Sequence, residues 1–143
     1  MGSEMCIRDS TRTGPRDPAL RRARVCYDHL AGQISVAVFD TMAARGWLEI
    51  APDQEGIALT KDGHAGLAAF GVASEGLDRP GRPVCRTCLD WSERRSHMAG
   101  GLGAALLERF VELGWVRRVK DSRLVEVSPK GEIGFRDQFD VRV

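Results

Sequence analysis

Apolar positions follow a helical period in two stretches of the chain, and each stretch ends at a Gly-Trp pair. Glycine follows each stretch, as Gly46 and Gly114, at the position where a helix commonly ends in a left-handed residue. We therefore predict helices over 33–45 and 101–113. In the second helix the spacing of three and four residues that marks one buried face is carried by Leu102, Leu106, Phe110 and Leu113.

Short β-prone segments follow each predicted helix and predict a two-stranded wing. Thr60 and Ser128 come next and are good N-caps for a further helix, with Pro129 at its favoured first position. Each stretch thus predicts a helix, a wing and a second helix, which is the layout of half a winged-helix domain. The predicted strands are 47–50 and 57–59 in the first stretch, and 115–120 and 124–127 in the second.

The two stretches are copies of one unit. Sliding the chain by 68 residues places residues 29–50 over residues 97–118 without a gap, so that His-Leu-Ala-Gly meets His-Met-Ala-Gly and Gly-Trp meets Gly-Trp. The same offset carries Thr60 onto Ser128. A shared frame for three separate signals indicates an internal repeat. We therefore predict an α+β fold, mainly α, made of duplicated winged-helix-like halves.

The repeat divides the chain into four parts. Residues 16–30 have an amphipathic pattern, and we predict a leading helix there. The first residues match no periodic template, and we interpret them, Cys6 included, as a non-native appendage. The predicted parts are the appendage (1–11), the first half with its leading helix (12–75), a Pro/Gly-rich connector (76–96) and the second half (97–143).

Composition narrows the class of protein. The chain has 143 residues, 43% of them hydrophobic and 29% charged, with a net charge of +1. Its overall charge gives no strong attraction to nucleic acid or to an anionic membrane. No run is long enough to span a membrane and no signal peptide is visible. Three cysteines outside the appendage, an odd number, favour reduced thiols. We therefore expect a cytoplasmic protein with no membrane partner.

Three segments together resemble a known family. They are "RRARVCYDHLAG", "LTKDG" and "RPVCRTCLDWSERRSHMAGGLGAALLERFVELGWVRR", and they are similar to the C-terminal half of bacterial ArsR-type (arsenic-repressor-like) helix-turn-helix transcriptional regulators. The resemblance spans roughly residues 12–140, and its motif "CLDWSERRxHxAG" is specific.

The resemblance implies a transcriptional regulator that binds DNA through the full-length protein, as a homodimer. Members of this set usually carry a further winged helix-turn-helix domain ahead of this region, which binds the operator. Residues 1–15 are too few for such a domain, so the resemblance implies a fragment without its DNA-reading N-terminal domain.

The predicted helices carry few side chains that read bases. A recognition helix presents Arg, Lys, Asn, Gln, Ser or Thr at several outward positions, and a carboxylate there opposes phosphate binding. We therefore predict the regulatory and dimerisation (effector) portion of a regulator. The outward positions are Gly101, Ala105, Glu108 and Glu112 in the second copy, and Gln33, Ala37, Asp40 and Ala44 in the first.

Direct DNA binding is the alternative. It would use the 101–113 helix and the second wing, which is basic. In this alternative the basic residues of the wing contact DNA phosphates. In the competing interpretation they are solvated charges that keep an exposed edge strand from pairing with other chains. The basic residues are Arg117, Arg118, Lys120 and Arg123.

Cysteine and histidine placement gives a third hypothesis, a metal- or thiol-sensing module. Cys26-x-x-His29 would lie on one turn of the predicted leading helix, and Cys85-x-x-Cys88 precedes His97. In both copies a Cys-x-Asp element precedes the His-x-Ala-Gly element, so Cys26, His29, Cys88 and His97 are the candidate ligands of a divalent metal such as Zn.

The metal hypothesis requires a particular arrangement of the four donor atoms. The four donor atoms must converge to within about 4 Å, and each His needs an acceptor such as Asp28 or Asp90. In the alternative the Cys are small core residues and each His caps a turn.

The segment 90–97, "DWSERRSH", predicts a helix start with Asp90 or Ser92 as N-cap and Trp91 as a core anchor. Arg94 and Arg95 are candidates for an anionic effector site, or else form exposed ion pairs.

No enzyme class is indicated. The chain contains no Gly-rich phosphate loop, no Gly-x-Ser-x-Gly elbow and no His-Glu-x-x-His. Asp28 and His29 on the predicted helix would point about 100° apart, so Asp28 is not expected to orient His29. We predict that the protein is not an enzyme.

Overall fold

The computed structural model describes residues 17–50, 56–74, 77 and 83–142. The predicted appendage, 1–11, lies outside these residues. In chain order the elements are α2 (Pro18–Arg22), β1 (Arg24–Cys26), β2 (His29–Ala31), α3 (Gln33–Ala44), β3 (Leu48–Ile50), β4 (Ile57–Leu59), α4 (Lys61–Phe70), β5 (Arg86–Leu89), β6 (Ser96–Ala99), α5 (Gly100–Glu112), β7 (Val116–Arg118), β8 (Val125–Val127) and α6 (Pro129–Phe139).

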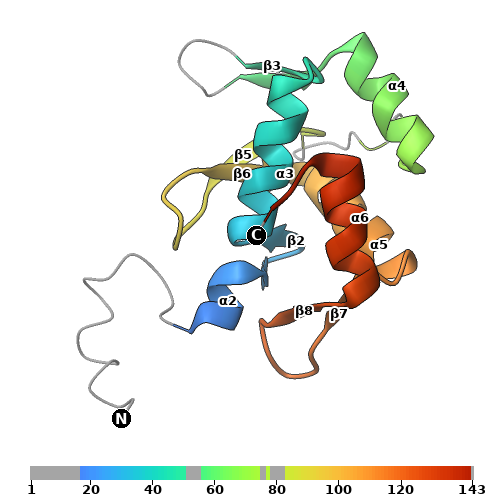
Figure 1. The fold of residues 1–143 in the computed structure, drawn as a ribbon. Coiled ribbons are helices and arrows are strands. Elements are labelled where there is room, and N and C mark those ends of the chain that lie inside the picture. The colour runs from blue at the N-terminus through green and yellow to red at the C-terminus, as the bar shows by residue number, and fades with distance from the viewer. Residues whose placement is uncertain (1–16, 51–55, 75–76, 78–82, 143) are drawn as a thin grey trace.

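After α2, the order hairpin, helix, hairpin, helix occurs twice. The second hairpins, β3–β4 and β7–β8, begin and end at positions that differ by the 68 residues of the repeat, and both are antiparallel. The helix that follows is capped in the same way, since the side chains of Thr60 and Ser128 accept from the N–H of Gly63 and Gly131 at 3.0 and 2.9 Å. The two wings lie at opposite ends of the molecule (Figure 1).

Each half contributes a helix that packs on the hairpin of the other half. Helix α3 lies against β6, helix α5 lies against β2, and β2 contacts β6. The buried apolar faces of both helices meet in one core, where Met42 and Phe110 are 0% and 1% exposed. This reciprocal packing places the first hairpins, β1–β2 and β5–β6, side by side near the middle of the chain's fold.

The His-x-Ala-Gly motif ends in a glycine because its backbone and surroundings admit no side chain. Gly32 has φ +98° and Gly100 has φ +74°, a region that L residues rarely adopt. A Cβ atom would also lie 2.8 Å from the Arg21 carbonyl oxygen at Gly32, and 2.7 Å from the Pro83 carbonyl oxygen at Gly100. The motif therefore marks the tight passage from a hairpin into the helix that follows it.

The single leading helix predicted over 16–30 is wrong. Helix α2 ends at Arg22, and the chain then forms the β1–β2 hairpin with Val25 opposite Leu30. Hydrogen bonds from distant residues hold the extended backbone, since Val25 N–H donates to the Arg123 carbonyl at 2.8 Å. Tertiary pairing with the second wing thus overrides the amphipathic pattern.

The helix predicted within 90–97 is also wrong. Residues between β5 and β6 form a turn, in which the Asp90 N–H donates to the Arg95 carbonyl at 2.7 Å. Trp91, the expected core anchor, is 45% exposed. The Asp90 side chain still accepts from the N–H of Ser92 and of Glu93, but these bonds stabilise a turn and cap no helix.

Candidate metal centre

Two hairpins place the four candidate ligands in equivalent positions. Cys26 is paired directly opposite His29 in β1–β2, and Cys88 is paired directly opposite His97 in β5–β6. Side chains that are directly opposite in an antiparallel pair lie on the same face of the hairpin. Cys26 and His29 are therefore neighbours because of strand register, and the predicted helical turn is replaced by a hairpin.

The two hairpins turn these faces toward each other. One ligand atom from each of Cys26, His29, Cys88 and His97 lies within 4.8 Å of all the others. The Nε2 atoms of the two imidazoles are 3.0 Å apart. Equivalent atoms of the two copies thus meet at the contact between β2 and β6.

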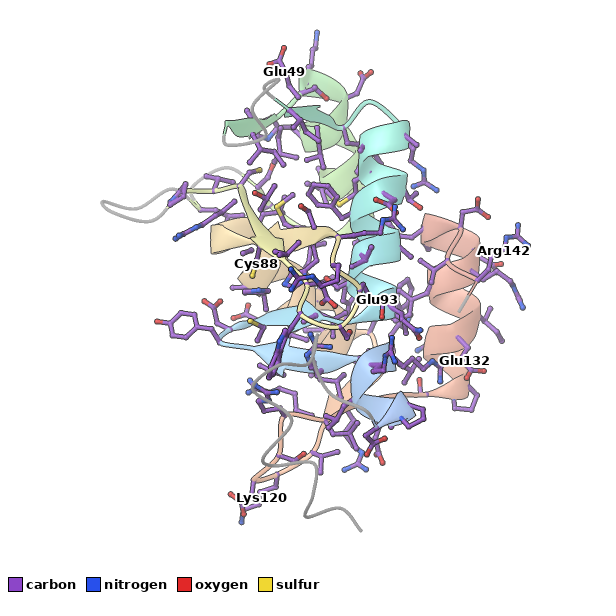
Figure 2. All side chains as sticks on the ribbon, turned by 90° about the vertical axis from the view of Figure 1, so that its left-hand side faces the viewer. Glu49, Cys88, Glu93, Lys120, Glu132 and Arg142 are labelled. Carbon is purple, nitrogen blue, oxygen red and sulfur yellow. The ribbon has the colours of Figure 1, made fainter. Side chains whose placement is uncertain are left out.

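The cluster is buried on its histidine side and reaches a pocket on its cysteine side. His97 and His29 are 1% and 5% exposed, whereas Cys26 and Cys88 are half-buried. A pocket of about 540 Å³ is lined by Cys26, His29 and Cys88, with Pro83 and Arg86 on its wall. Figure 2 shows Cys88 near the middle of the molecule's length, away from Glu49 at one end and Lys120 at the other.

A carboxylate lies beside the second ring nitrogen of each histidine. His29 Nδ1 is 3.4 Å from Asp28 Oδ1. His97 Nδ1 is 3.0 Å from Asp90 Oδ1, although the geometry departs from that of a hydrogen bond. The expectation that Asp28 cannot orient His29 is wrong, because it assumed a helix where the chain forms a hairpin.

Asp90 is the centre of a buried polar network. It is 0% exposed. Its Oδ1 accepts from the Gly32 N–H at 2.7 Å and from Arg24 Nη2 at 3.4 Å, and its Oδ2 accepts from the Ser92 hydroxyl at 2.9 Å. Burial by itself would raise the pKa of Asp90, but contacts from His97, Gly32, Glu93 and Arg24 outweigh burial and hold that pKa well below its usual range. The carboxylate is therefore ionised at neutral pH.

Sequence analysis did not identify Arg24 as a member of this network. Arg24 is 3% exposed, and its Nη1 donates to the Ser92 hydroxyl at 3.1 Å and to the Leu20 carbonyl at 3.3 Å. An arginine in an Arg-rich amphipathic stretch is typical of a solvated helix face. Its partners lie 66 and 68 residues away, beyond the reach of local patterns.

The three described cysteines fall into two environments. Burial, followed by the nearby Cys26, raises the pKa of the Cys88 thiol. Cys85 lies apart in the apolar core, where burial raises its pKa to about 11. Of the ligands considered from sequence, Cys85 is thus outside the cluster.

The other candidate site residues lie on the surface. Arg95 forms an ion pair with Asp40 of α3, and Arg94, also exposed, has a left-handed backbone with φ 58°. Their proposed contact with an anionic effector stays a prediction.

The basic wing is exposed at the end of the molecule that Lys120 marks in Figure 2. Arg117 pairs across the wing with Glu126, which neutralises part of its charge. Arg118 and Arg123 are exposed on the same hairpin and its turn. Phosphate contact by this wing stays a prediction.

Comparison with known proteins relates the chain to a helix-turn-helix regulator. It is 35% identical over 124 residues to YdfF of Bacillus subtilis (strain 168), described as an uncharacterized HTH-type transcriptional regulator. The match covers 87% of this chain and 54% of that protein, so the chain spans about half the length of this relative. No family model and no solved structure matches the chain. The similarity supports the broader part of the sequence interpretation, a relationship to transcriptional regulators.

Within the described residues, every helix is too short or too polar to cross a membrane.

Proposed function

We propose that the chain is the regulatory and dimerisation portion of an ArsR-type transcriptional regulator. The repeated order of hairpin, helix, hairpin and helix supports the effector role; in this proposal each half is winged-helix-like, and a further N-terminal domain would read the operator. In this proposal the protein acts as a cytoplasmic homodimer that binds DNA through the full-length molecule. Similarity to an HTH-type regulator over most of this chain supports the class.

One observation carries the regulatory role. The helices that precede the wings, α3 and α5, are built into the core between the halves. Six of the twelve residues of α3 and six of the thirteen of α5 are buried. Each follows a hairpin, whereas a recognition helix follows another helix through a short turn.

The side chains of α3 and α5 that lie outside the core also oppose DNA binding. Glu108 and Glu112 are exposed on α5, and Asp40 on α3 is tied to Arg95. A carboxylate near the phosphate backbone weakens the electrostatic attraction that drives binding. The basic wing is thus left as the surface for the alternative function, direct DNA binding.

DNA binding by the full chain separates the two functions. Fluorescence anisotropy at about 0.15 M salt measures the binding of the chain to DNA duplexes of random and of palindromic sequence. We expect weak binding to both, without sequence preference. Any residual affinity is expected to fall when Arg118 and Lys120 are both changed to Glu, because phosphate contacts alone would produce it. Sub-micromolar, sequence-specific binding would contradict the regulatory role.

Sedimentation equilibrium on the same sample tests the homodimer. We expect a mass of twice 15.7 kDa at micromolar concentration, and a single-chain mass at all concentrations would contradict this part of the proposal.

A further inference from the structure

The Cys–His cluster has the dimensions of a coordination shell. With bonds of about 2.0–2.3 Å, neighbouring ligands of a tetrahedral zinc ion lie about 3.3–3.8 Å apart. The four donors already lie within 4.8 Å of one another, and the two Nε2 atoms within 3.0 Å. Binding an ion would need the two imidazole nitrogens to separate by a few tenths of an ångström and the other donors to approach by about 1 Å, which are small movements because the hairpins already face each other.

The orientation of the imidazoles favours a cation between them. A neutral imidazole has one N–H donor and one acceptor nitrogen. Where Nδ1 donates to a carboxylate, as Asp28 and Asp90 are placed to accept, Nε2 presents its lone pair. Two such lone pairs would face each other at 3.0 Å. A proton on one Nε2 would turn this contact into a hydrogen bond between the rings; with both Nε2 atoms unprotonated, a metal ion that binds both nitrogens removes the repulsion, and carboxylate–histidine–metal arrangements are common in proteins.

Charge balance selects the kind of ion. Two thiolates and two neutral imidazoles carry a charge of −2, which a divalent cation cancels. The negative charge of the two thiolates would lie against the almost fully buried His29 and His97. Charge at a buried site is costly unless an opposite charge compensates it. Sulfur and imidazole nitrogen together are typical ligands of zinc, whereas magnesium and calcium prefer oxygen.

Strand register and the Asp90 hydrogen-bond network position the four candidate ligands without an ion. Strand register sets each Cys opposite its His, and the Asp90 network ties the β5–β6 turn to Arg24 and Gly32 of the first half. A pocket lies beside Cys26 and Cys88, and an ion would enter from this side of the cluster.

We propose that Cys26, His29, Cys88 and His97 form a tetrahedral site for one divalent zinc ion, which joins the two halves of the repeat. Each half supplies one sulfur and one nitrogen. This inference goes beyond the proposed function and does not rest on it, since the chain alone binds the ion and no DNA takes part in its test.

Cobalt titration of the full chain tests the site, because tetrahedral Co²⁺ bound by thiolates has distinctive visible and near-ultraviolet absorption. The protein is purified without a His-tag, carries Cys6→Ser, and is stripped with EDTA and reduced with a phosphine. We expect saturation at one Co²⁺ per chain, displacement by Zn²⁺, and a higher Tm when Zn²⁺ is bound.

The chain supplies matched controls, since each ligand type also occurs outside the cluster. Cys88→Ser and His97→Asn are expected to weaken binding about 100-fold or more, and Asp28→Asn about 10- to 100-fold. Cys85→Ala and His64→Asn leave the spectrum and the affinity unchanged, because Cys85 lies in the core and His64 pairs with Ser74.

Two results would overturn the proposal. One is the lack of tetrahedral thiolate bands in the folded wild-type chain. The other is bands that survive the ligand substitutions, which would indicate an adventitious site. Circular dichroism checks folding, and if a buried variant such as His97→Asn does not fold, Cys26→Ser at the half-buried rim gives the same test.

Discussion

Replacing Asp90 with Ala lowers the free energy of unfolding by about 3–5 kcal/mol. The substitution leaves the buried Arg24 guanidinium without its carboxylate, and leaves the Gly32 and Glu93 N–H groups without their acceptor. Buried polar groups without a hydrogen-bond partner destabilise the folded state, because they have lost their hydration and gained no bond in exchange. Urea unfolding followed by tryptophan fluorescence measures the change, with EDTA present so that metal binding does not contribute.

The matched control is Asp137→Ala. Asp137 is exposed and forms a surface ion pair with its neighbour Arg136, so its loss is expected to change stability by about 0.5 kcal/mol or less. Asp90→Asn keeps the shape and some acceptor capacity, and is expected to fall between the two. A loss below about 1 kcal/mol for Asp90→Ala would show that the network does not hold the halves together.

Replacing Phe110 with Ala is expected to cost about 3–5 kcal/mol as well. Phe110 is 1% exposed. Its ring stacks on Trp115 with centroids 5.8 Å apart and meets Phe135 edge-on at 4.8 Å, so it joins α5 to α6 and to the second wing. A cavity at this point loses the contacts of several aromatic rings at once, and the same urea experiment measures the loss.

Neighbouring and milder substitutions give the comparison. Val111, the next residue, is 42% exposed, and Val111→Ala is expected to change stability by less than about 1 kcal/mol. Phe110→Leu retains most of the volume and is expected to cost about 1–1.5 kcal/mol. Equal effects of Phe110→Ala and Val111→Ala would contradict the position of Phe110 in the shared core.

The parts of the fold that local signals specify were predictable. The helices at 33–44 and 100–112 end within a residue of their predicted limits. Gly46 and Gly114 have the left-handed backbone expected after them, with φ +76° and +74°. These features depend on apolar period, on capping hydroxyls and on glycine, all of which act over a few residues.

The hairpins that carry the candidate site were not predictable in the same way. Strand β1 is held by the second wing through the Val25 N–H and the Arg123 carbonyl, and the partner of Arg24 is Asp90. Such contacts join residues far apart in the chain, and a short strand of three residues has little pattern of its own. The four candidate ligands could nevertheless be chosen from the sequence, because the repeat places Cys and His in corresponding positions whatever element carries them, and the structure brings their donor atoms together.

The central claim is that both halves of the repeat meet at one zinc ion, and X-ray absorption at the zinc edge tests it most directly. For the zinc-loaded full chain we predict a first shell of two sulfur atoms at about 2.3 Å and two nitrogen atoms at about 2.0–2.1 Å, the nitrogen shell carrying the outer scattering of imidazole. A shell of nitrogen and oxygen alone would contradict the claim, as would one with a single sulfur.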